Sequence, residues 1–378
     1  MATRLLDLEL SNGGPLPDVP LRYERIRLLA RLHGIPLGFV DVENSRGTLD
    51  PPELSATALR NLERQAWAVT LTQRLTGADA ENGERPPVTV VVAATGMSGG
   101  VERCLAAIAG QRYRAEEVIS LDADRGGRVA AWNRGLSAAR TPIVAFTDDR
   151  SVPDPDWLEA VAAAFHPGID AVTGLVVPAE LETRAQEGFE DDFGGARKGF
   201  RPALYSRRTG HIPYRPGKYG AACNMAFRRE ALERLGGFDA AVEAGEGDVG
   251  AEADALQRLI EAGAAVAYRP EAIVRRVHVR SVRALRRQLY ADARACSASL
   301  TAAFLRARGR ERLRVATAYW AWLWRRQASP FVRRVFRRGW PPRRCLLAGL
   351  LGGLAGPAVY GASRVFRSAR TPDPPGHA

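Results

Sequence analysis

The sequence of 378 residues is poor in the residue types that build metal centres and disulfide frameworks. Its four cysteines are scattered, with no Cys-x-x-Cys pair and no Cys/His cluster, so neither a zinc site nor a set of disulfides is indicated. A reducing compartment fits this pattern. The first residues also lack a basic segment followed by an apolar one, so we expect no secretory signal.

Lysine is scarce as well, since Lys198 and Lys218 are the only two in the chain. The formal net charge is +12, but residues 312–378 alone hold thirteen arginines against one acidic residue, Asp373. Residues 1–311 are therefore formally neutral. A neutral main body has no basic excess for phosphate contacts, so we expect no nucleic acid as a partner.

The N-terminal segment, residues 1–85, is predicted to form a small α+β unit. The stretch Ile26–Val42 indicates two strands around a turn at residues 33–36, and a helix is expected over residues 54–75. Residues 77–87 are polar and rich in proline and glycine, which is typical of a linker. Nothing in this segment carries recognisable chemistry.

From Val88 onward the pattern alternates between strands and helices. The run Val88–Ala94 is apolar and mostly β-branched, as a buried parallel strand should be. Residues 179–220 show little periodicity and indicate a long ordered connection over a cleft. This alternation predicts an α/β fold with a parallel sheet and right-handed crossovers. Further strands are expected over residues 117–121, 143–148, 171–177 and 274–280, and helices over residues 101–108, 126–139, 157–165 and 251–262.

The clearest chemical signal is the stretch Pro142–Trp157. An apolar run, Ile143–Phe146, stops at Thr147, Asp148, Asp149 and Arg150 and is followed by turn residues and a helix. This order predicts a buried strand that delivers carboxylates to its carboxyl end. In open α/β sheets that edge is where ligands bind. The structural alternative is that the two acids only cap the next helix or lie in a turn.

The order of the motifs resembles the inverting family 2 glycosyltransferases of the GT-A fold. The resemblance covers roughly residues 86–300, and the N-terminal unit is similar to leader units on some bacterial members. The matching stretches are VTVVVAAT, the strand end at Asp122, RVAAWNRGLSAA, FTDDRSVPDPDWL, YGAACNMAFRREALERLGGFD, GAEADALQRLIEAG and VRRVHVRSVRALRRQLY.

This resemblance implies a Rossmann-like, mostly parallel sheet with helices on both faces, in a catalytic domain over residues 86–310. It also implies an enzyme that moves a sugar from a nucleoside-diphosphate donor with inversion. The expected acceptor is a cell-envelope glycan or a lipid-linked saccharide, as in polysaccharide biosynthesis. The rival hypothesis is a non-catalytic relative that binds nucleotide sugar or a partner in the same cleft. A nucleotidyltransferase has less support, because no matching glycine-rich motif with a basic residue follows the first strand.

In the family, an Asp-x-Asp motif at the strand end contacts the ribose with its first acid and holds a divalent cation with its last. Here Asp148 matches the first position and Arg150 the last. Arginine cannot ligate Mg²⁺ or Mn²⁺, but it can bind a pyrophosphate directly. We therefore expect Arg150 to replace part of the role of the cation, with Asp149 and His278 as the remaining candidate metal ligands.

Four more residues match positions near the substrates in the family. Asp122, at a second strand end, and Thr95, on the loop after the first strand, match the nucleotide side. Asn224 and Met225 match the loop that lines the acceptor side. Three of them have a structural alternative: a plain loop residue for Thr95, a helix-start asparagine for Asn224 and a core methionine for Met225.

The candidate base is Glu252, which takes the position of the family's catalytic acid at the start of a helix. It shares a helix face with Leu256, Leu259 and Ile260. Asp254 is a second catalytic candidate, but it lies on the other face, where we expect a solvated side chain paired with Arg258 four residues on. An acid in the first helical turn also has a structural role, because it complements the helix dipole.

Residues 311–378 form a tail of different composition. The stretch Tyr319–Trp324 is strongly aromatic, paired arginines follow, and Cys345–Ala362 contains no charged residue. Clustered tryptophan and arginine suit an interface with anionic lipid, while the uncharged stretch is short and glycine-rich for a membrane span. We expect a cytoplasmic protein attached peripherally, or through a re-entrant segment, to the inner face of the cell membrane. The alternative is a soluble tail that packs on the catalytic domain.

Overall fold

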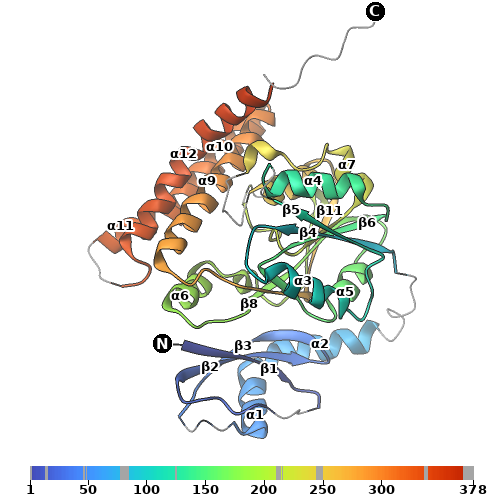
Figure 1. Cartoon of the computed structure of the whole chain (residues 1–378), viewed down its shortest axis with the longest axis vertical. Coiled ribbons are helices and arrows are strands. Elements are labelled where there is room, and N and C mark those ends of the chain that lie inside the picture. Colours follow the sequence, from blue (N-terminus) through green and yellow to red (C-terminus); the bar gives the residue numbers. More distant parts are fainter. Residues whose placement is uncertain are drawn as a thin grey trace, which may run out of the picture.

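Two β-sheets and a group of long C-terminal helices organise the chain (Figure 1). The computed structural model describes residues 2–12, 16–45, 47, 49–76, 85–123, 126–209, 214, 216–243, 250–335 and 339–368. Parts of the expected linker at residues 77–87, and of the loops around residues 124 and 245, lie outside these ranges. The description below concerns the described residues.

The N-terminal unit is a three-stranded sheet backed by two helices. Its elements are β1 (Ala2–Glu9), β2 (Tyr23–Leu32), β3 (Ile35–Glu43), α1 (Pro51–Asn61) and α2 (Glu63–Thr76). The predicted hairpin is confirmed, with His33 and Gly34 at the turn in left-handed conformations (φ 52° and 77°). The predicted single helix is divided at Leu62. The strand β1, which pairs with β2 in parallel, had no sequence signal.

The central sheet has the order β5-β4-β6-β10-β8-β11-β7, with β9 on β11. The predicted mixed α/β class is confirmed, but the sheet is less parallel than expected, because β10 runs antiparallel between β6 and β8. Its strands are β4 (Val88–Ala94), β5 (Glu117–Asp122), β6 (Ile143–Asp148), β7 (Ser151–Pro153), β8 (Ile169–Pro178), β9 (Ala203–Tyr205), β10 (Met225–Arg228) and β11 (Ala265–Arg276).

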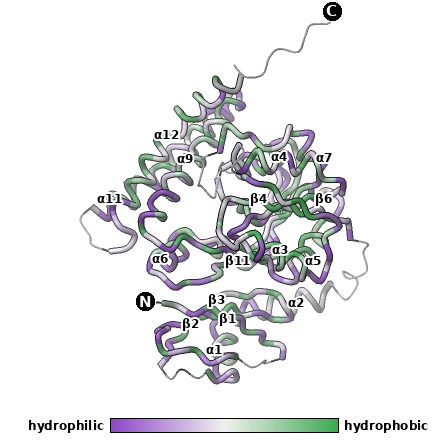
Figure 2. The backbone as a smooth tube through the Cα atoms, in the orientation of Figure 1, coloured by the Kyte–Doolittle hydropathy of each residue, from purple (hydrophilic) through white to green (hydrophobic). Residues whose placement is uncertain are grey.

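Helices cover both faces of this sheet (Figure 1). Alternate residues of β4 point to opposite sides: Val91 packs in the core with Trp132 of α4, and Val90 packs in the core with Trp157 of α5. Burial on both faces explains the mostly apolar sequences of β4 and β6, which Figure 2 shows in the interior. The helices are α3 (Gly100–Ala109), α4 (Arg128–Ala138), α5 (Trp157–Ala163), α6 (Arg184–Phe193), α7 (Arg229–Arg234) and α8 (Ala251–Glu261).

The predicted bounds of the last strand in this unit are wrong. The last strand, β11, ends at Arg276, so His278 lies beyond it and not inside the predicted strand 274–280. The strand also begins earlier than predicted, at Ala265. Its pairing with β8 shifts register between Arg269 and Ile273, around Pro270, which has no amide proton to donate. The described part of the connection 179–220 contains α6, β9 and the short helices η2 (Gly195–Lys198) and η3 (Arg207–Thr209).

The expected C-terminal tail is helical and lies against the central unit. It follows α9 (Val282–Arg306) with α10 (Gly309–Trp322), the π-helical turn η5 (Leu323–Ala328), α11 (Ser329–Val335) and α12 (Arg343–Ser368). Glycines of α12 permit close approach to α9: a Cβ added at Gly356 would lie 2.6 Å from the Arg294 carbonyl oxygen. The Tyr360 hydroxyl of α12 donates to Asp239 at 3.1 Å. The tail therefore packs on the central unit, as the alternative to membrane attachment requires.

Candidate active site at the carboxyl end of the central sheet

The first strand-end acid, Asp148, is buried in an ion pair. Its side chain accepts hydrogen bonds from the Arg276 Nη1 at 2.8 and 2.9 Å and from the Ser151 hydroxyl at 2.7 Å. Burial alone would raise the pKa of Asp148, but Arg276, Ser151 and Arg128 outweigh it and hold the pKa below its ordinary value. The carboxylate therefore stays charged. The pairing of β11 with β7 places Arg276 opposite Ser151 and brings all three side chains together.

The second acid, Asp149, holds the loop that follows β4. Its carboxylate accepts the Thr95 amide at 2.8 Å, the Thr95 hydroxyl at 2.7 Å and the Met97 amide at 2.8 Å. Asp149 is 2% exposed. These bonds join two predicted nucleotide-side residues, Thr95 and Asp149, in one structural unit that fixes the loop beside the strand end.

Arg150, at the position of the family's metal ligand, faces the chain after β11. Its Nη2 and Nε donate to the Val277 carbonyl oxygen at 3.0 and 3.3 Å. Its amide donates to Asp148 at 3.2 Å. The guanidinium is only partly buried, so it lies at the rim of the site.

The candidate base, Glu252, is buried at the start of α8 and is 1% exposed. Its Oε2 accepts the Gly250 amide at 2.8 Å, while Oε1 has no hydrogen-bond partner in the described part of the chain. Burial raises the pKa of Glu252 to about 6, against the opposing effects of Arg128, the helix-start amides and Lys198. Leu256, Leu259 and Ile260 on the same helix face are buried with it, but the opposite face of α8 is buried as well.

Arg128 connects the strand end with α8. This residue begins α4 and lowers the pKa of both Asp148 and Glu252 through its charge. Two of the predicted site residues therefore lie in one electrostatic neighbourhood. Arg128, Arg276 and Lys198 were not predicted as site residues, although the first two lie in stretches that carry the family resemblance.

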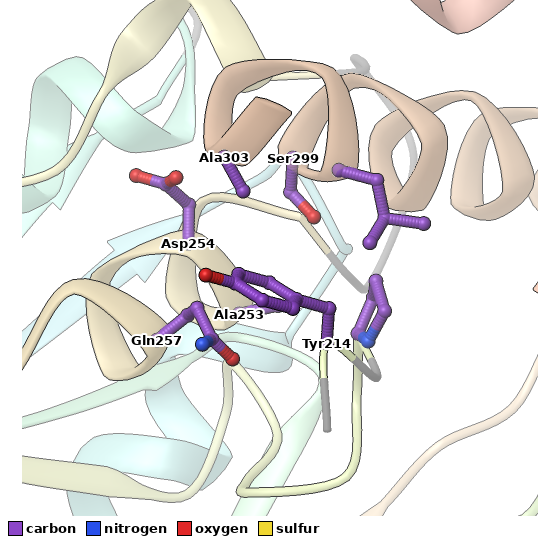
Figure 3. Close-up of a pocket in the computed structure, with 8 residues that line it drawn as sticks. Tyr214, Ala253, Asp254, Gln257, Ser299 and Ala303 are labelled. Atoms are coloured by element: carbon purple, nitrogen blue, oxygen red, sulfur yellow. The ribbon is translucent and has the colours of Figure 1, made fainter. Parts of the chain in front are cut away.

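Asp254 is buried and not solvated, so that expectation is wrong. The pair with Arg258 is present at 2.7 Å, and Arg306 of α9 lies 2.8 Å from the other carboxylate oxygen. The reason is tertiary: α9 packs across α8 and covers the face that sequence periodicity assigns to solvent. Figure 3 shows the resulting small cavity, in which Asp254 of α8 and Ser299 of α9 line the same space.

The remaining predicted residues have mainly structural partners. Asn224 is fully buried; its amide donates to two backbone carbonyls of β8 and β11, and its oxygen accepts from Trp157 at 2.9 Å. Met225 begins β10 and is buried in the core, as its alternative supposed. Asp122 ends β5 with an exposed side chain. The roles of these three residues toward substrate stay predictions.

Both predicted metal ligands have protein partners in the structure. Asp149 already accepts three hydrogen bonds, and His278 is buried with its Nε2 3.0 Å from Glu190. Among the described residues there is no group of three or more His, Cys, Asp or Glu side chains arranged to hold a metal ion. As arranged, these residues do not fit a divalent cation.

The fold and the buried charged side chains define an α/β protein with a polar site at one sheet edge. A family model described as glycosyltransferase-like family 2 matches residues 72–295, more than half of the chain. The chain belongs to this family of glycosyltransferases. The GT-A type of α/β fold predicted from the sequence is confirmed.

Two curated relatives illustrate the similarity. The chain is 27% identical over 220 residues to a pre-mycofactocin glycosyltransferase of Mycobacterium tuberculosis, covering 51% of this chain and 45% of that protein. It is 31% identical over 121 residues to a glucosyl-dolichyl phosphate glucuronosyltransferase of Haloferax volcanii, covering 28% of this chain and 35% of that protein. The chain therefore spans less than half the length of the curated relatives it matches.

Two solved structures are also similar. One is a mannosyltransferase of Pyrobaculum calidifontis in complex with GDP-Man and Mn²⁺, with a TM-score of 0.46, 18% identity, and coverage of 76% of this chain and 98% of that chain. The other is GalNAc-T7 with UDP, GalNAc and Mn²⁺, with a TM-score of 0.39, 10% identity, and coverage of 67% and 58%. Likeness at this level assigns no residue role.

Proposed function

We propose that this protein transfers a sugar from a nucleoside-diphosphate donor to an acceptor hydroxyl with inversion, and that Glu252 is the base. Family membership supports the donor class. The observation that carries the proposal is the state of Glu252: a buried carboxylate with one oxygen unpartnered and a pKa of about 6. A base with a pKa near the working pH accepts a proton efficiently and is still ionised beforehand.

The reaction is a single displacement. Glu252 takes the proton of the acceptor hydroxyl, and the hydroxyl oxygen attacks the anomeric carbon from the face opposite the diphosphate. The bond between the anomeric carbon and the diphosphate oxygen breaks, and its electron pair leaves with the nucleoside diphosphate. Attack from the opposite face inverts the anomeric centre. The proton on Glu252 passes to solvent when the products leave.

Arginines support the departure of the diphosphate in this proposal. Arg150 lies at the rim beside the buried Asp148–Arg276 pair, and its guanidinium can exchange the Val277 carbonyl for phosphate oxygens. Asp122 would contact the nucleoside, whereas Asp148, whose carboxylate is occupied by Arg276 and Ser151, would hold Arg276 on the donor side. The loop of Thr95, fixed by Asp149, would lie beside the nucleobase and ribose of the donor.

The test is donor turnover by the full chain, measured for a panel of UDP- and GDP-sugars with water and methyl glucoside as acceptors. We expect turnover in the wild type and a loss of roughly 10²–10⁴-fold in Glu252→Gln. Since the pKa of Glu252 is about 6, kcat/KM should fall about tenfold per pH unit below 6. Glu261→Gln, at the other end of α8, is the matched control and should keep its activity.

Parallel assays with EDTA, Mg²⁺ and Mn²⁺ measure the dependence on a cation. The rival function, binding of nucleotide sugar without turnover, has its own supporting observation, because Asp148 and Asp149 are both fully engaged by protein donors. Nucleotide-induced thermal stabilisation without donor turnover under any metal condition would establish that rival and reject the proposal.

We further propose a lipid-linked or envelope acceptor and peripheral attachment to a membrane. The name of the Haloferax relative gives a dolichyl phosphate substrate to that protein. In this chain, α12 holds a 23-residue apolar segment, Arg343–Val365, with a mean hydropathy of 1.6 and 39% of its apolar window buried. This segment by itself is weak support for a membrane span. Stronger support comes from α10 and η5, where Trp320 and Trp324 are 64% and 60% exposed beside arginines.

Flotation of the full chain with phosphatidylglycerol vesicles tests this attachment. We expect the wild type to float with these vesicles at low salt and not with phosphatidylcholine vesicles, and Trp320→Ser with Trp324→Ser to reduce flotation severalfold. Trp67→Ser is the matched control, because Trp67 is equally exposed on α2. Equal flotation of all variants would place any membrane contact elsewhere.

A further inference from the structure

A second buried charge without a partner lies near Glu252. The Nζ of Lys198, at the end of η2 in the connection 179–220, has no hydrogen-bond partner in the described part of the chain. The same holds for the Glu252 Oε1. Buried ammonium and carboxylate groups are rare unless they are paired, because each loses its hydration on burial.

The two groups influence one another but do not pair directly. The carboxylate of Glu252 raises the pKa of Lys198 and the ammonium of Lys198 lowers that of Glu252, while burial dominates both and brings the pKa of Lys198 down to about 8. No hydrogen bond or ion pair between them is present among the described residues. The other titratable neighbours are Cys223 on the Lys198 side, and Arg128 and Cys296 on the Glu252 side.

The chemistry of the two unpartnered atoms restricts what belongs with them. A carboxylate oxygen needs a hydrogen-bond donor, whereas an ammonium needs an acceptor. A hydroxyl group supplies both with one oxygen. A phosphate oxygen without a proton satisfies only the lysine, and an ammonium ligand satisfies only the glutamate. A water molecule has the same pair of functions and would be the resting occupant.

We infer that Lys198 is an acceptor-binding residue: its Nζ donates a hydrogen bond to the oxygen of the hydroxyl whose proton Glu252 Oε1 accepts. This inference rests on the proposed function. As the proton moves to Glu252, negative charge develops on the hydroxyl oxygen, and the buried ammonium stabilises it in a water-poor site. Lys198 thereby acts on the nucleophile, and the arginines act on the leaving group.

The kinetic test compares Lys198→Met with Lys218→Met in the full chain. Methionine has a similar length without the charge, and Lys218 is the other lysine, stacked over the Tyr205 ring at 5.5 Å. We expect Lys198→Met to lower kcat/KM for methyl glucoside by roughly 10²-fold and to leave the thermal shift induced by UDP or GDP unchanged. Lys218→Met should match the wild type. Full transfer by Lys198→Met, or loss of the nucleotide shift, would overturn the inference; the second result would make Lys198 a phosphate ligand.

A second measurement works without turnover. With lysine labelled with ¹³C at Cε, the protein gives two lysine resonances, and Lys218→Met assigns them. We expect Lys198 to titrate near pH 8 and at a lower pH in Glu252→Gln, and glycerol, as a hydroxyl probe, to shift the Lys198 resonance selectively. A Lys198 pKa that Glu252→Gln leaves unchanged, or no selective shift with glycerol, overturns the inference. If the wild type turns over no donor, the proposed function fails, and the titration still decides whether the Lys198–Glu252 site exists.

Discussion

The acids at the end of β6 and the acid at the start of α8 are equally buried but differ in their partners. Asp148 accepts hydrogen bonds from Arg276 and Ser151, and Asp149 accepts three from the loop after β4. Glu252 has one oxygen bonded to the Gly250 amide and the other without a protein partner. Asp148 and Asp149 therefore have protein hydrogen-bond donors without a ligand, whereas the Oε1 of Glu252 lacks a donor.

This difference separates structural from chemical roles. Buried polar groups in folded proteins are nearly always hydrogen-bonded, so the exceptions need an explanation. At the strand end the carboxylates fix Arg276 and the loop of Thr95, which shape the donor side. At α8 the unpartnered Oε1 and the nearby Lys198 Nζ are arranged for a group that the chain itself does not supply. The family resemblance points to both places, and the unsatisfied Glu252 Oε1 and Lys198 Nζ distinguish the second from the first.

Among the substitutions that test this comparison, we expect Asp148→Asn to cause the largest loss of stability. The substitution removes the charge that compensates Arg276, which is 5% exposed, and breaking one partner of a buried pair costs about 3–5 kcal/mol. We expect the free energy of unfolding, measured by urea denaturation at pH 7, to fall by about this amount. Because the folded-state pKa of Asp148 is lowered, this stabilisation is present above the unfolded-state pKa and is lost as pH falls through the folded-state value.

Asp156→Asn is the matched control for that measurement. Asp156 pairs with Arg112 at the surface, where the two side chains are 38% and 71% exposed, so its loss should change stability by less than about 1 kcal/mol. Equal, small effects of both substitutions would show that the Asp148–Arg276 pair does not hold the strand end, and the contrast with Glu252 would lose its basis.

Local patterns in the sequence predicted the elements that deliver the site. The apolar runs of β4 and β6 are buried on both faces, and the helix expected over residues 251–262 is present as α8. The position of Glu252 on the apolar face of α8 was also predictable, because helical periodicity alone places it with Leu256.

Contacts between distant segments were not predictable in the same way. Arg276 reaches Asp148 across 128 residues of sequence, and nothing in either stretch specifies the pair. The face of Asp254 is polar by periodicity, yet α9 covers it. Lys198 lies in a stretch of little periodicity; its signal was its rarity, since an arginine-rich chain retains only two lysines. Such residues become visible only when burial and partners are known.

At Lys198 we expect a smaller change in the free energy of unfolding, and one that stabilises the protein. Burial lowers the pKa of this lysine from 10.5 to about 8, so carrying the charge costs the folded state up to about 3 kcal/mol at pH 7. Lys198→Met should raise the free energy of unfolding by about 1–3 kcal/mol, less than the full amount because Glu252 loses a nearby cation.

Between pH 8 and 10.5 the unfolded chain binds more protons than the folded one, so wild-type stability rises with pH and the advantage of the variant shrinks there. Urea denaturation at pH 7 and pH 10, with Lys218→Met as control, measures both trends. A Lys198→Met variant less stable than the wild type at pH 7 would show that the ammonium is satisfied within the protein, and that it belongs with Asp148 and Asp149 rather than with Glu252.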